Sequence, residues 1–433
     1  MKTENNSLSV FQWLIYLLAN SIAIPIVVGD IFQLSSTELS SLMQRVFFIV
    51  GLSSFIQAKF GHRYPIADGP AGSWVSIFVI YASLGIQQGK PLLETLQILE
   101  SGILISGLIL LLVGLTKWVR HLVFLFTPIV TGVFLLILAV QLSGVFLKGM
   151  VSTNNGAGQI DIVSLILSLF VFFLIILLLV KGKGWLKSYA ILIGIMFGWI
   201  MFAILGKDST SIFSTDEVLK LPKLFDWGLP VFNGSIMITA ILFTFLLISN
   251  TIAAIASAEE AIPKQKSFFR KRLYSGIWAG GVSHIVASLF SSIAVVPLPA
   301  TAGFVKITKQ YRILPFLVAC GILIVISVFP PIVGFLAALP LPVASAALLA
   351  TLIEMYRIAL YSLKKQGLTI KSSCIMGISI FAGIGTMFLS DEFFSGLPYL
   401  LQNICSNGLL VGTFMAISLE LLLKRRRSSI EGA

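Results

Sequence analysis

The sequence predicts an all-α polytopic membrane protein with 14 transmembrane segments, arranged as a 7+7 inverted repeat with short strands and half-helices in spans 3 and 10. Three observations predict this fold class. The composition is too apolar for a soluble protein, and the basic residues gather on one side of a 14-span topology. Two broken segments also occupy matching places in the two halves of the chain.

The composition points to lipid as the solvent. Of 433 residues, 57% are hydrophobic and 11% are charged, whereas a soluble domain carries about 25% charged residues. The net charge of +12 would suggest nucleic-acid binding in a soluble protein. Here the basic residues lie in short links between apolar runs, which favours an orientation signal instead. We therefore expect a lipid bilayer and no nucleic acid among the partners.

Fourteen apolar runs are the predicted spans. A bilayer core about 30 Å thick needs about 20 apolar residues per helix. The runs lie near residues 8–29, 40–58, 70–86, 98–115, 124–146, 160–180, 187–206, 233–256, 273–293, 299–311, 313–330, 342–363, 371–388 and 405–423. The third and the tenth are short and interrupted by glycine and proline.

The distribution of basic residues supports counting both short runs as spans. If all fourteen runs cross, 24 of the 30 Lys and Arg residues lie on the side of the N-terminus and five lie on the other side, while Arg45 falls within a span. The positive-inside rule then places both termini in the cytoplasm, with the protein in the plasma membrane. The acidic stretch 207–228 becomes the one sizeable outer loop, and it separates two halves of seven spans.

The two broken segments predict the site. Residues 64–74 read YPIADGPAGSW, and residues 295–304 read VVPLPATAGF. Irregular backbone at membrane depth survives only where protein buries it or where it lines a polar cavity. A short strand before each half-helix would let two helix N-termini converge, each with free backbone N–H groups. This pattern indicates an inverted-repeat transporter with a midplane site; the alternative is a pair of proline-kinked helices without a special role.

Several motifs resemble the nucleobase–ascorbate transporter family of uracil, xanthine and purine permeases. Gln12 and Pro25 stand in FQWLIYLLANSIAIPIVVG, where the Gln-His pair of the family's first span is replaced by Gln12-Trp13. The other motifs are TPIVTGVFLLILAVQLS at 127–143, LKSYAILIGIMFGW at 186–199, FPPIVGFLAALPLPVASAALLA at 329–350 and GLPYLLQNICSNGLLVGTFMAISLELLL at 396–423. The likeness runs from about residue 10 to 424, which is nearly the whole chain.

The resemblance implies a division into two domains and a homodimer. A core domain would comprise spans 1–4 and 8–11, and a gate domain spans 5–7 and 12–14. The implied boundaries are 1–120 and 233–330 for the two parts of the core, 121–206 and 331–433 for the two parts of the gate with a basic tail, and 207–232 for the outer loop.

Two family carboxylates are missing. Uracil and xanthine permeases carry a glutamate in span 8 and often a second at the start of span 10. The matching positions here are Asn250 and a place near Ala300, so neither can titrate. This makes the substrate and the coupling to protons open questions, while the resemblance in fold is unaffected.

The residues expected at the site follow from the broken segments and the resemblance. The predicted substrate-binding residues are Gly69, Pro70, Ala71, Gly72, Asn250, Pro299, Ala300 and Thr301. Asp68 and His284 are the candidates for proton coupling, because an ionisable group inside the membrane is functional by default. Alternatively, Asp68 pairs with Arg63 or a helix N-terminus, and His284 bonds to a backbone carbonyl.

Other charged residues receive structural interpretations. Arg45 is expected to snorkel or to meet a carbonyl, and Glu354 to pair with Arg357 one turn on. Glu259 and Glu260 are interpreted as a solvated helix cap, and the tail at 424–427 as an anchor to anionic lipid.

The leading functional hypothesis is a secondary transporter for a nucleobase, a purine such as xanthine or else uracil, with possible proton coupling. One alternative is an anion carrier of the sulfate or bicarbonate type with the same inverted architecture, since helix N-termini alone would favour an anion. The other is a transport-inactive sensor. No phosphate-binding loop, catalytic triad order or metal cluster is visible in the sequence, so we expect no enzyme, no metal and no cofactor.

Overall fold

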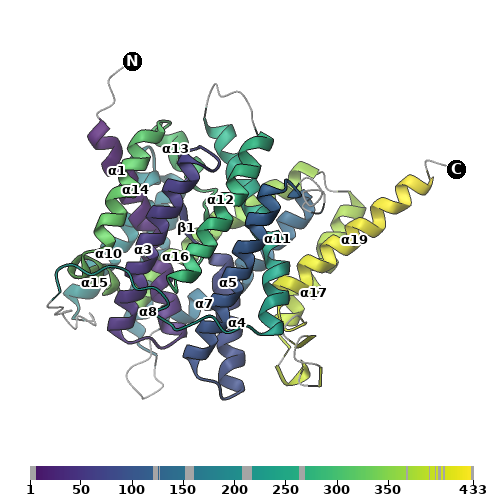
Figure 1. Ribbon diagram of the computed structural model, residues 1–433, viewed down its shortest axis with the longest axis horizontal. Helices are drawn as coiled ribbons and strands as arrows, with labels where there is room; N and C mark the ends of the chain where they lie inside the picture. The colour runs from purple at the N-terminus through teal and green to yellow at the C-terminus, as the bar shows by residue number, and fades with distance from the viewer. Residues whose placement is uncertain are drawn as a thin grey trace.

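The structure of the chain is a computed structural model. It describes residues 6–119, 125, 127–151, 160–206, 217–262, 269–366, 369–389, 391–394, 396–397, 401–402 and 405–430. Helices dominate this part of the chain, and one pair of short strands lies inside the bundle (Figure 1). The prediction of a mostly helical membrane protein is confirmed.

The first half of the chain contains one strand and nine described helices. These are α1 (Asn6–Ser21), α2 (Ala23–Ile31), α3 (Ser36–Lys59), β1 (Asp68–Pro70), α4 (Gly72–Gln87), α5 (Leu92–Leu115), α7 (Pro128–Met150), α8 (Ile162–Lys181), α9 (Trp185–Ser188) and α10 (Ala190–Ile204), of which α9 is a single turn. The predicted first span is divided at Ile22, because Pro25 three residues later cannot donate the amide hydrogen bond that a continuous helix requires.

The second half repeats the order of a long helix, a second long helix, a strand and a short helix. Its elements are α11 (Gly234–Ala261), α12 (Phe269–Leu289), β2 (Val295–Pro297), α13 (Thr301–Thr308), α14 (Ile313–Ser327), α15 (Pro330–Ala337), α16 (Leu341–Gln366), α17 (Ile370–Met387), η2 (Asp391–Phe394) and α19 (Gly408–Ile430). The sequence predictions did not include α15, which is bent by 92° from α14 at the break between Ser327 and Pro330. Pro330 and Pro331 begin the new helix.

Many of the described helices can cross a bilayer. Eight described helical segments are long and apolar enough to cross a bilayer, if α1 and α2 are counted together as one segment. The bent pair α14–α15 adds a ninth if it forms one span. Three shorter apolar helices also occur, at Gly72–Ile86, Ala190–Ile204 and Gly408–Leu423. The protein is therefore a multi-pass membrane protein.

The helices pack in two groups. In the first group, α5 contacts α11 and α12, and α3 contacts α12 and α14, while α1 contacts α14. In the second group, α16 contacts α7, α8 and α10, and α7 contacts α17 and α19. Only a few described pairs join the groups, among them α2 with α16, α4 with α7, and α9 with α13.

The contact between α5 and α12 depends on glycines. A Cβ atom on Gly107 would lie 2.8 Å from the backbone nitrogen of Ile285, and one on Gly114 would meet the backbone of Trp278. Small residues at these positions allow the two backbones to touch, as is common between membrane helices. This contact holds α12, which carries Ser283 and His284, against the rest of the first group.

The link before β1 is braced at one end of α3. The Tyr64 hydroxyl donates to Glu259 on α11 at 2.8 Å, and the Arg272 guanidinium lies 4.0 Å from the centroid of the Tyr64 ring. The Tyr64 amide donates to Nδ1 of His62. Burial, and secondly the charge of Arg272, lower the pKa of His62 to about 3, so this imidazole is neutral. Glu259 is therefore partly engaged in the protein, not only a solvated cap.

The link before β2 is braced at the opposite end of α3 by Arg45. The Arg45 guanidinium donates to the carbonyl oxygen of Ser291 at 2.5 Å and lies 3.3 Å from a carboxylate oxygen of Asp226. Glu100 of α5 accepts from the Ser291 hydroxyl at 3.1 Å. Arg45 thus meets carbonyls as expected, and in addition an acidic partner that the sequence reading did not foresee.

Residues 217–231 form a strap over this end of the first group. The side-chain amide of Gln44 on α3 donates to the carbonyl of Lys220, and the amide of Phe225 donates to the carbonyl of Leu289 at the end of α12. The strap is the described part of the predicted outer loop, whose residues 207–216 lie outside the described residues.

Candidate functional site

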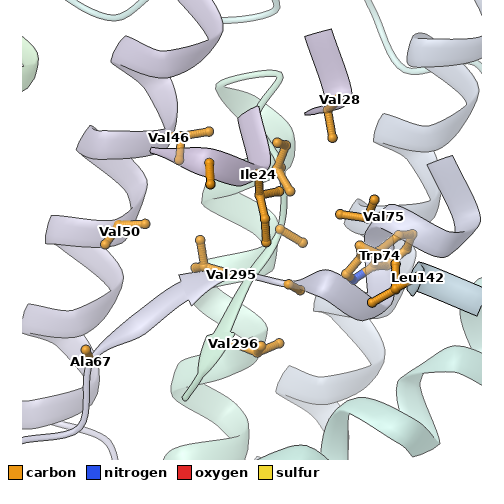
Figure 2. Close-up of a cluster of buried hydrophobic side chains, with 14 of the residues drawn as sticks. Ile24, Val28, Val46, Val50, Ala67, Trp74, Val75, Leu142, Val295 and Val296 are labelled. Carbon is orange, nitrogen blue, oxygen red and sulfur yellow. The ribbon is translucent and has the colours of Figure 1, made fainter. Parts of the chain in front are cut away.

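The site is built around two strands that cross inside the bundle. β1 and β2 are antiparallel, with Asp68 opposite Pro297, Gly69 opposite Val296 and Pro70 opposite Val295. The amide of Ala71 donates to Ala294 at 2.8 Å, and the amide of Leu298 donates to Ala67 at 2.9 Å, which closes the ladder at both ends. Figure 2 shows the crossing at Val295 and Val296, with Trp74 and Val75 on the helix that follows β1.

The pairing places the starts of α4 and α13 at opposite ends of the strands. Each strand has three residues, and a strand advances about 3.3 Å per residue, so roughly 10 Å separate the two helix starts along the ladder. The predicted short strands before half-helices are therefore present. The predicted residues Gly69, Pro70, Ala71 and Gly72 lie at or next to one start, and Pro299, Ala300 and Thr301 at the other.

The start of α4 offers free backbone donors. Its N-cap, Ala71, has no side chain able to cap the helix. In the described part of the chain, the amides of Gly72 and Ser73 have no backbone acceptor. A Cβ atom on Gly72 would lie 3.5 Å from Leu142 of α7, an ordinary van der Waals contact, so this helix start faces the second group of helices.

The start of α13 differs, and it corrects one expectation. The amides of Thr301, Ala302 and Gly303 donate to the carbonyls of Leu298, Pro299 and Ala300 at 3.0–3.1 Å. These tight turns satisfy the first amides of the helix, because proline at 297 and 299 holds the chain in a turn-forming conformation. The prediction that both half-helices present free N–H groups is therefore wrong for α13.

Asn250 connects α11 to the end of β2. Its side-chain nitrogen donates to the Pro297 carbonyl at 3.0 Å. A carbonyl oxygen can only accept, so the amide nitrogen must face the strand and the amide oxygen is left for another donor. The adjacent Ser249 hydroxyl lies 3.2 Å from that of Thr131 on α7, which joins the two groups of helices at this level.

An aromatic cluster packs beneath α13. The Tyr16 hydroxyl donates to Thr301 Oγ1 at 3.4 Å, and the Tyr16 ring lies 4.4 Å from that of Phe304. Trp13, one helical turn before Tyr16, lies 4.8 Å from the same Phe304 ring. The sequence prediction named the Gln12-Trp13 pair and did not include Tyr16. The spacing of three residues between Trp13 and Tyr16 nevertheless places both rings on one helix face.

Ala300 differs from its neighbours in exposure. Gly69, Pro70, Ala71 and Thr301 are buried, whereas Ala300 is exposed at the start of α13. Because the Ala300 side chain is small and exposed, it leaves room for a planar ring at the start of α13. Ala300 therefore remains a candidate substrate-binding residue.

Asp68 lies among serines. Its side chain is 1% exposed, and its Oδ2 atom forms a hydrogen bond with the Ser53 hydroxyl of α3. The Asp68 amide donates to the Ser54 hydroxyl at 2.9 Å. Arg63 is exposed to solvent, and among the described residues no ion pair reaches Asp68. The alternative in which Arg63 neutralises Asp68 is therefore wrong.

His284 is held by two hydrogen bonds. The Trp74 indole N–H donates to His284 Nε2 at 3.4 Å, and His284 Nδ1 lies 2.9 Å from the Gly280 carbonyl. Because an indole nitrogen only donates, Nε2 must accept and Nδ1 must carry the proton. This arrangement matches the alternative in which His284 bonds to a backbone carbonyl. It orients Trp74 at the start of α4.

Known proteins resemble this chain over most of its length. The model of a permease family, Xan_ur_permease, matches residues 5–392. The Bacillus subtilis (strain 168) protein named "Putative purine permease YwdJ" is 33% identical over 98% of this chain and 97% of its own length. The xanthine permease of the same organism is 25% identical, over 95% of this chain and 92% of its own length.

Solved structures support the fold. The transmembrane domain of a cyanobacterium bicarbonate transporter, BicA, superposes with a TM-score of 0.65 at 15% identity. The match covers 95% of this chain and 97% of that domain. At this identity the similarity concerns the fold alone.

Proposed function

Because the chain belongs to this xanthine and uracil permease family of membrane transporters, we propose that it is a secondary transporter for a purine base, bound between the starts of α4 and α13 and beside Asn250. The observation that carries the proposal is the asymmetric strand crossing. One end offers free amide donors at Gly72 and Ser73, and the other end holds the acceptor oxygen of Asn250.

A nucleobase is complementary to this arrangement. Its edge carries carbonyl and ring-nitrogen acceptors next to N–H donors. The acceptors would take the amides of Gly72 and Ser73, and an N–H group would donate to the Asn250 oxygen. The small, exposed side chain of Ala300 allows a flat ring to approach the backbone. Gly69 and Ala71 are buried and would shape the crossing beside the ring, since a Cβ atom on Gly69 would lie 2.8 Å from Leu298. Pro70, Pro299 and Thr301 complete the proposed site by fixing the turns on either side.

The anion carrier is the second candidate. Its support is the shared fold with a bicarbonate transporter. The free amides at the start of α4 could receive an anion, whereas the first amides of α13 are already bonded. The sequence relatives are named for purines and xanthine, so the purine proposal has the better support.

We infer the finer architecture from the pairs of packed helices. Under an exchange of the first seven spans with the last seven, the pair α5–α12 corresponds to α14–α3, α5–α11 to α14–α1, and α7–α17 to α16–α8. This correspondence supports fourteen spans in a 7+7 inverted repeat. The two groups of helices would be the core domain, 1–120 with 233–330, and the gate domain, 121–206 with 331–433. A homodimer is our expectation from the family alone.

We propose a topology in the plasma membrane with both termini in the cytoplasm and the strap on the outer side. The basic asymmetry of the sequence supports this orientation. Single cysteines at Glu217 and Arg426 should be labelled from opposite sides of the membrane by an impermeant thiol reagent, in a background without the three native cysteines. Labelling of both from the same side would contradict the topology.

Uptake into proteoliposomes tests the function. Purified protein should accumulate radiolabelled purines, with uracil as a second base and sulfate and bicarbonate as anions in parallel vesicles. Competition by unlabelled xanthine but not by sulfate is the expected result. Transport of an anion without any purine would overturn the proposal and favour the second candidate. Transport of neither class would favour the inactive sensor.

A further inference from the structure

A chain of hydroxyl groups leads from Asp68 to the backbone of α12. The Ser53 hydroxyl contacts both Asp68 Oδ2 and the Ser283 hydroxyl, the latter at 2.6 Å. The Ser283 hydroxyl in turn lies 3.0 Å from the Ala279 carbonyl on its own helix. The second oxygen of Asp68, Oδ1, is buried and has no hydrogen-bond partner in the described part of the chain.

The hydroxyl hydrogens of Ser53 and Ser283 can be arranged in two ways, and only the arrangement with a protonated Asp68 makes all three contacts hydrogen bonds. Each serine hydroxyl has one hydrogen. If Asp68 is protonated, it donates to Ser53, Ser53 donates to Ser283, and Ser283 donates to Ala279, so all three contacts are hydrogen bonds. If Asp68 is ionised, Ser283 donates to Ser53 and Ser53 donates to the carboxylate. The Ala279 contact then loses its hydrogen.

The two arrangements differ little in hydrogen bonding and greatly in charge. Ionisation gives up one neutral hydrogen bond, which is a small loss. It also leaves a buried charge whose Oδ1 atom is unpaired, which is a much larger loss in a dry site. The protonated form of Asp68 is therefore favoured while the site is dry. It can release the proton when water reaches Oδ1, without breaking the contact between Ser53 and Ser283.

Among the described residues, no other charged group faces Asp68 from the elements packed around it. α3 contributes Ser53 and Ser54, and α12 contributes Ser283, with His284 already bonded to Trp74 and Gly280. The strand β2 presents Pro297 opposite Asp68. On α14 the nearby titratable group is the buried thiol of Cys320, and on α1 it is Tyr16, which bonds to Thr301.

We propose that Asp68 is the proton-binding group of this transporter and that the Ser53–Ser283 chain passes its protonation state to α12. The proposal rests on the proposed function, because a coupled proton has a role only if the protein moves a substrate. The step balances: the O–H bond of Asp68 breaks, its electron pair stays on the carboxylate, and the proton passes to water. His284 then positions Trp74 and does not carry the proton.

The first experiment needs no substrate. Infrared difference spectra of the purified parent protein and the Asp68→Asn variant should show a protonated carboxyl C=O band at neutral pH that the variant lacks. Ser53→Ala should shift this band, because it removes the group bonded to the acid, whereas Ser101→Ala should leave it in place. Ser101 is a matched control, since its buried hydroxyl bonds only to Ile98 of its own helix. Identical spectra of the parent and Asp68→Asn would overturn the proposal.

The second experiment separates coupling from transport. In proteoliposomes with an inward pH gradient, the parent should accumulate purine above the outside concentration. Asp68→Asn should bring purine only to equal concentrations on the two sides. Asn is isosteric, and its amide can donate to Ser53 as the protonated acid does. Gradient-driven accumulation by Asp68→Asn equal to that of the parent would overturn the proposal. Absence of any purine binding by the parent would instead contradict the proposed function and leave the infrared result to decide on Asp68.

Discussion

The two broken segments share a backbone and differ in what they carry. Each has a left-handed residue in the preceding link, at Arg63 and Ser291, then a three-residue strand ending in proline, then a half-helix without a side-chain cap. The first strand carries Asp68 where the second carries Val295. The helix after the first strand has 16 residues, and the helix after the second has eight.

The two segments therefore carry different groups, whereas a symmetric crossing would carry the same groups in both segments. The first segment carries the buried acid and the free amides, and its helix is fixed by the bond between Trp74 and His284. The second segment closes its amides in turns, and it reaches the exposed Ala300 and a left-handed stop at Lys309. A repeated backbone thus sets the geometry, while single residues distinguish the segment with the buried Asp68 from the segment with the exposed Ala300.

The largest effect is expected when the second strand is given the residue of the first. Val295→Asp would place a carboxylate at a buried position without the serines that surround Asp68. We expect a loss of about 3–5 kcal/mol of stability, seen as a lower melting temperature in detergent and less folded protein in the membrane. Val295→Thr is the neutral control of similar size. A Val295→Asp protein as stable as the parent would show that the two strands are equivalent.

A bulky residue should act differently at the two helix starts. Ala300→Phe would fill the open start of α13, so purine affinity should fall by about 100-fold or more while the protein still folds. Ala71→Phe would overpack a buried N-cap and should cost about 1–3 kcal/mol of stability. Equilibrium binding of labelled purine, with size-exclusion profiles as the folding control, measures both. Unchanged affinity in Ala300→Phe would remove α13 from the site.

Removing the side chain that joins α11 to β2 should have an intermediate effect. Asn250→Ala loses the bond to Pro297 and the acceptor oxygen, so we expect purine affinity to fall about tenfold. Thr251→Val is the matched control, because its hydroxyl bonds to Leu247 of its own helix. If both variants bind purine as the parent does, Asn250 lies outside the site.

The smallest effect is expected beneath α13. Tyr16→Phe removes one hydroxyl contact of 3.4 Å and keeps the ring against Phe304. Purine affinity should change by less than about threefold, since a long, neutral hydrogen bond contributes little. A tenfold loss would show that the substrate itself bonds to the Tyr16 hydroxyl.

The sequence predicts the frame of the molecule better than its polar contacts. Glycine and proline in both broken segments predict strands followed by half-helices, because these residues interrupt helices locally. The family motifs extend this prediction over the whole chain. The pairing of Ser53 with Asp68, and that of Glu100 with Ser291, join residues far apart in sequence, so no local pattern indicates them.

The state of the α13 amides was missed for a related reason. Prolines at 297 and 299 indicated an extended entry to α13. Residues 298–303 instead form tight turns, whose hydrogen bonds use the first amide donors of the helix. Whether a helix start is open or closed depends on a few dihedral angles. Residue types restrict these angles without fixing them.

The ion pair between Arg45 and Asp226 imposes an order of events during synthesis. Asp226 emerges from the ribosome about 180 residues after Arg45, a delay of roughly 10–40 s at ~5–20 residues per second. During that interval the arginine of α3 sits in a nascent membrane helix with neither the strap nor the Ser291 carbonyl to receive it. The first half of the chain therefore stays only partly assembled until the second half has been synthesised. Ribosome-bound chains ending before residue 226 should leave Arg45 open to chemical modification.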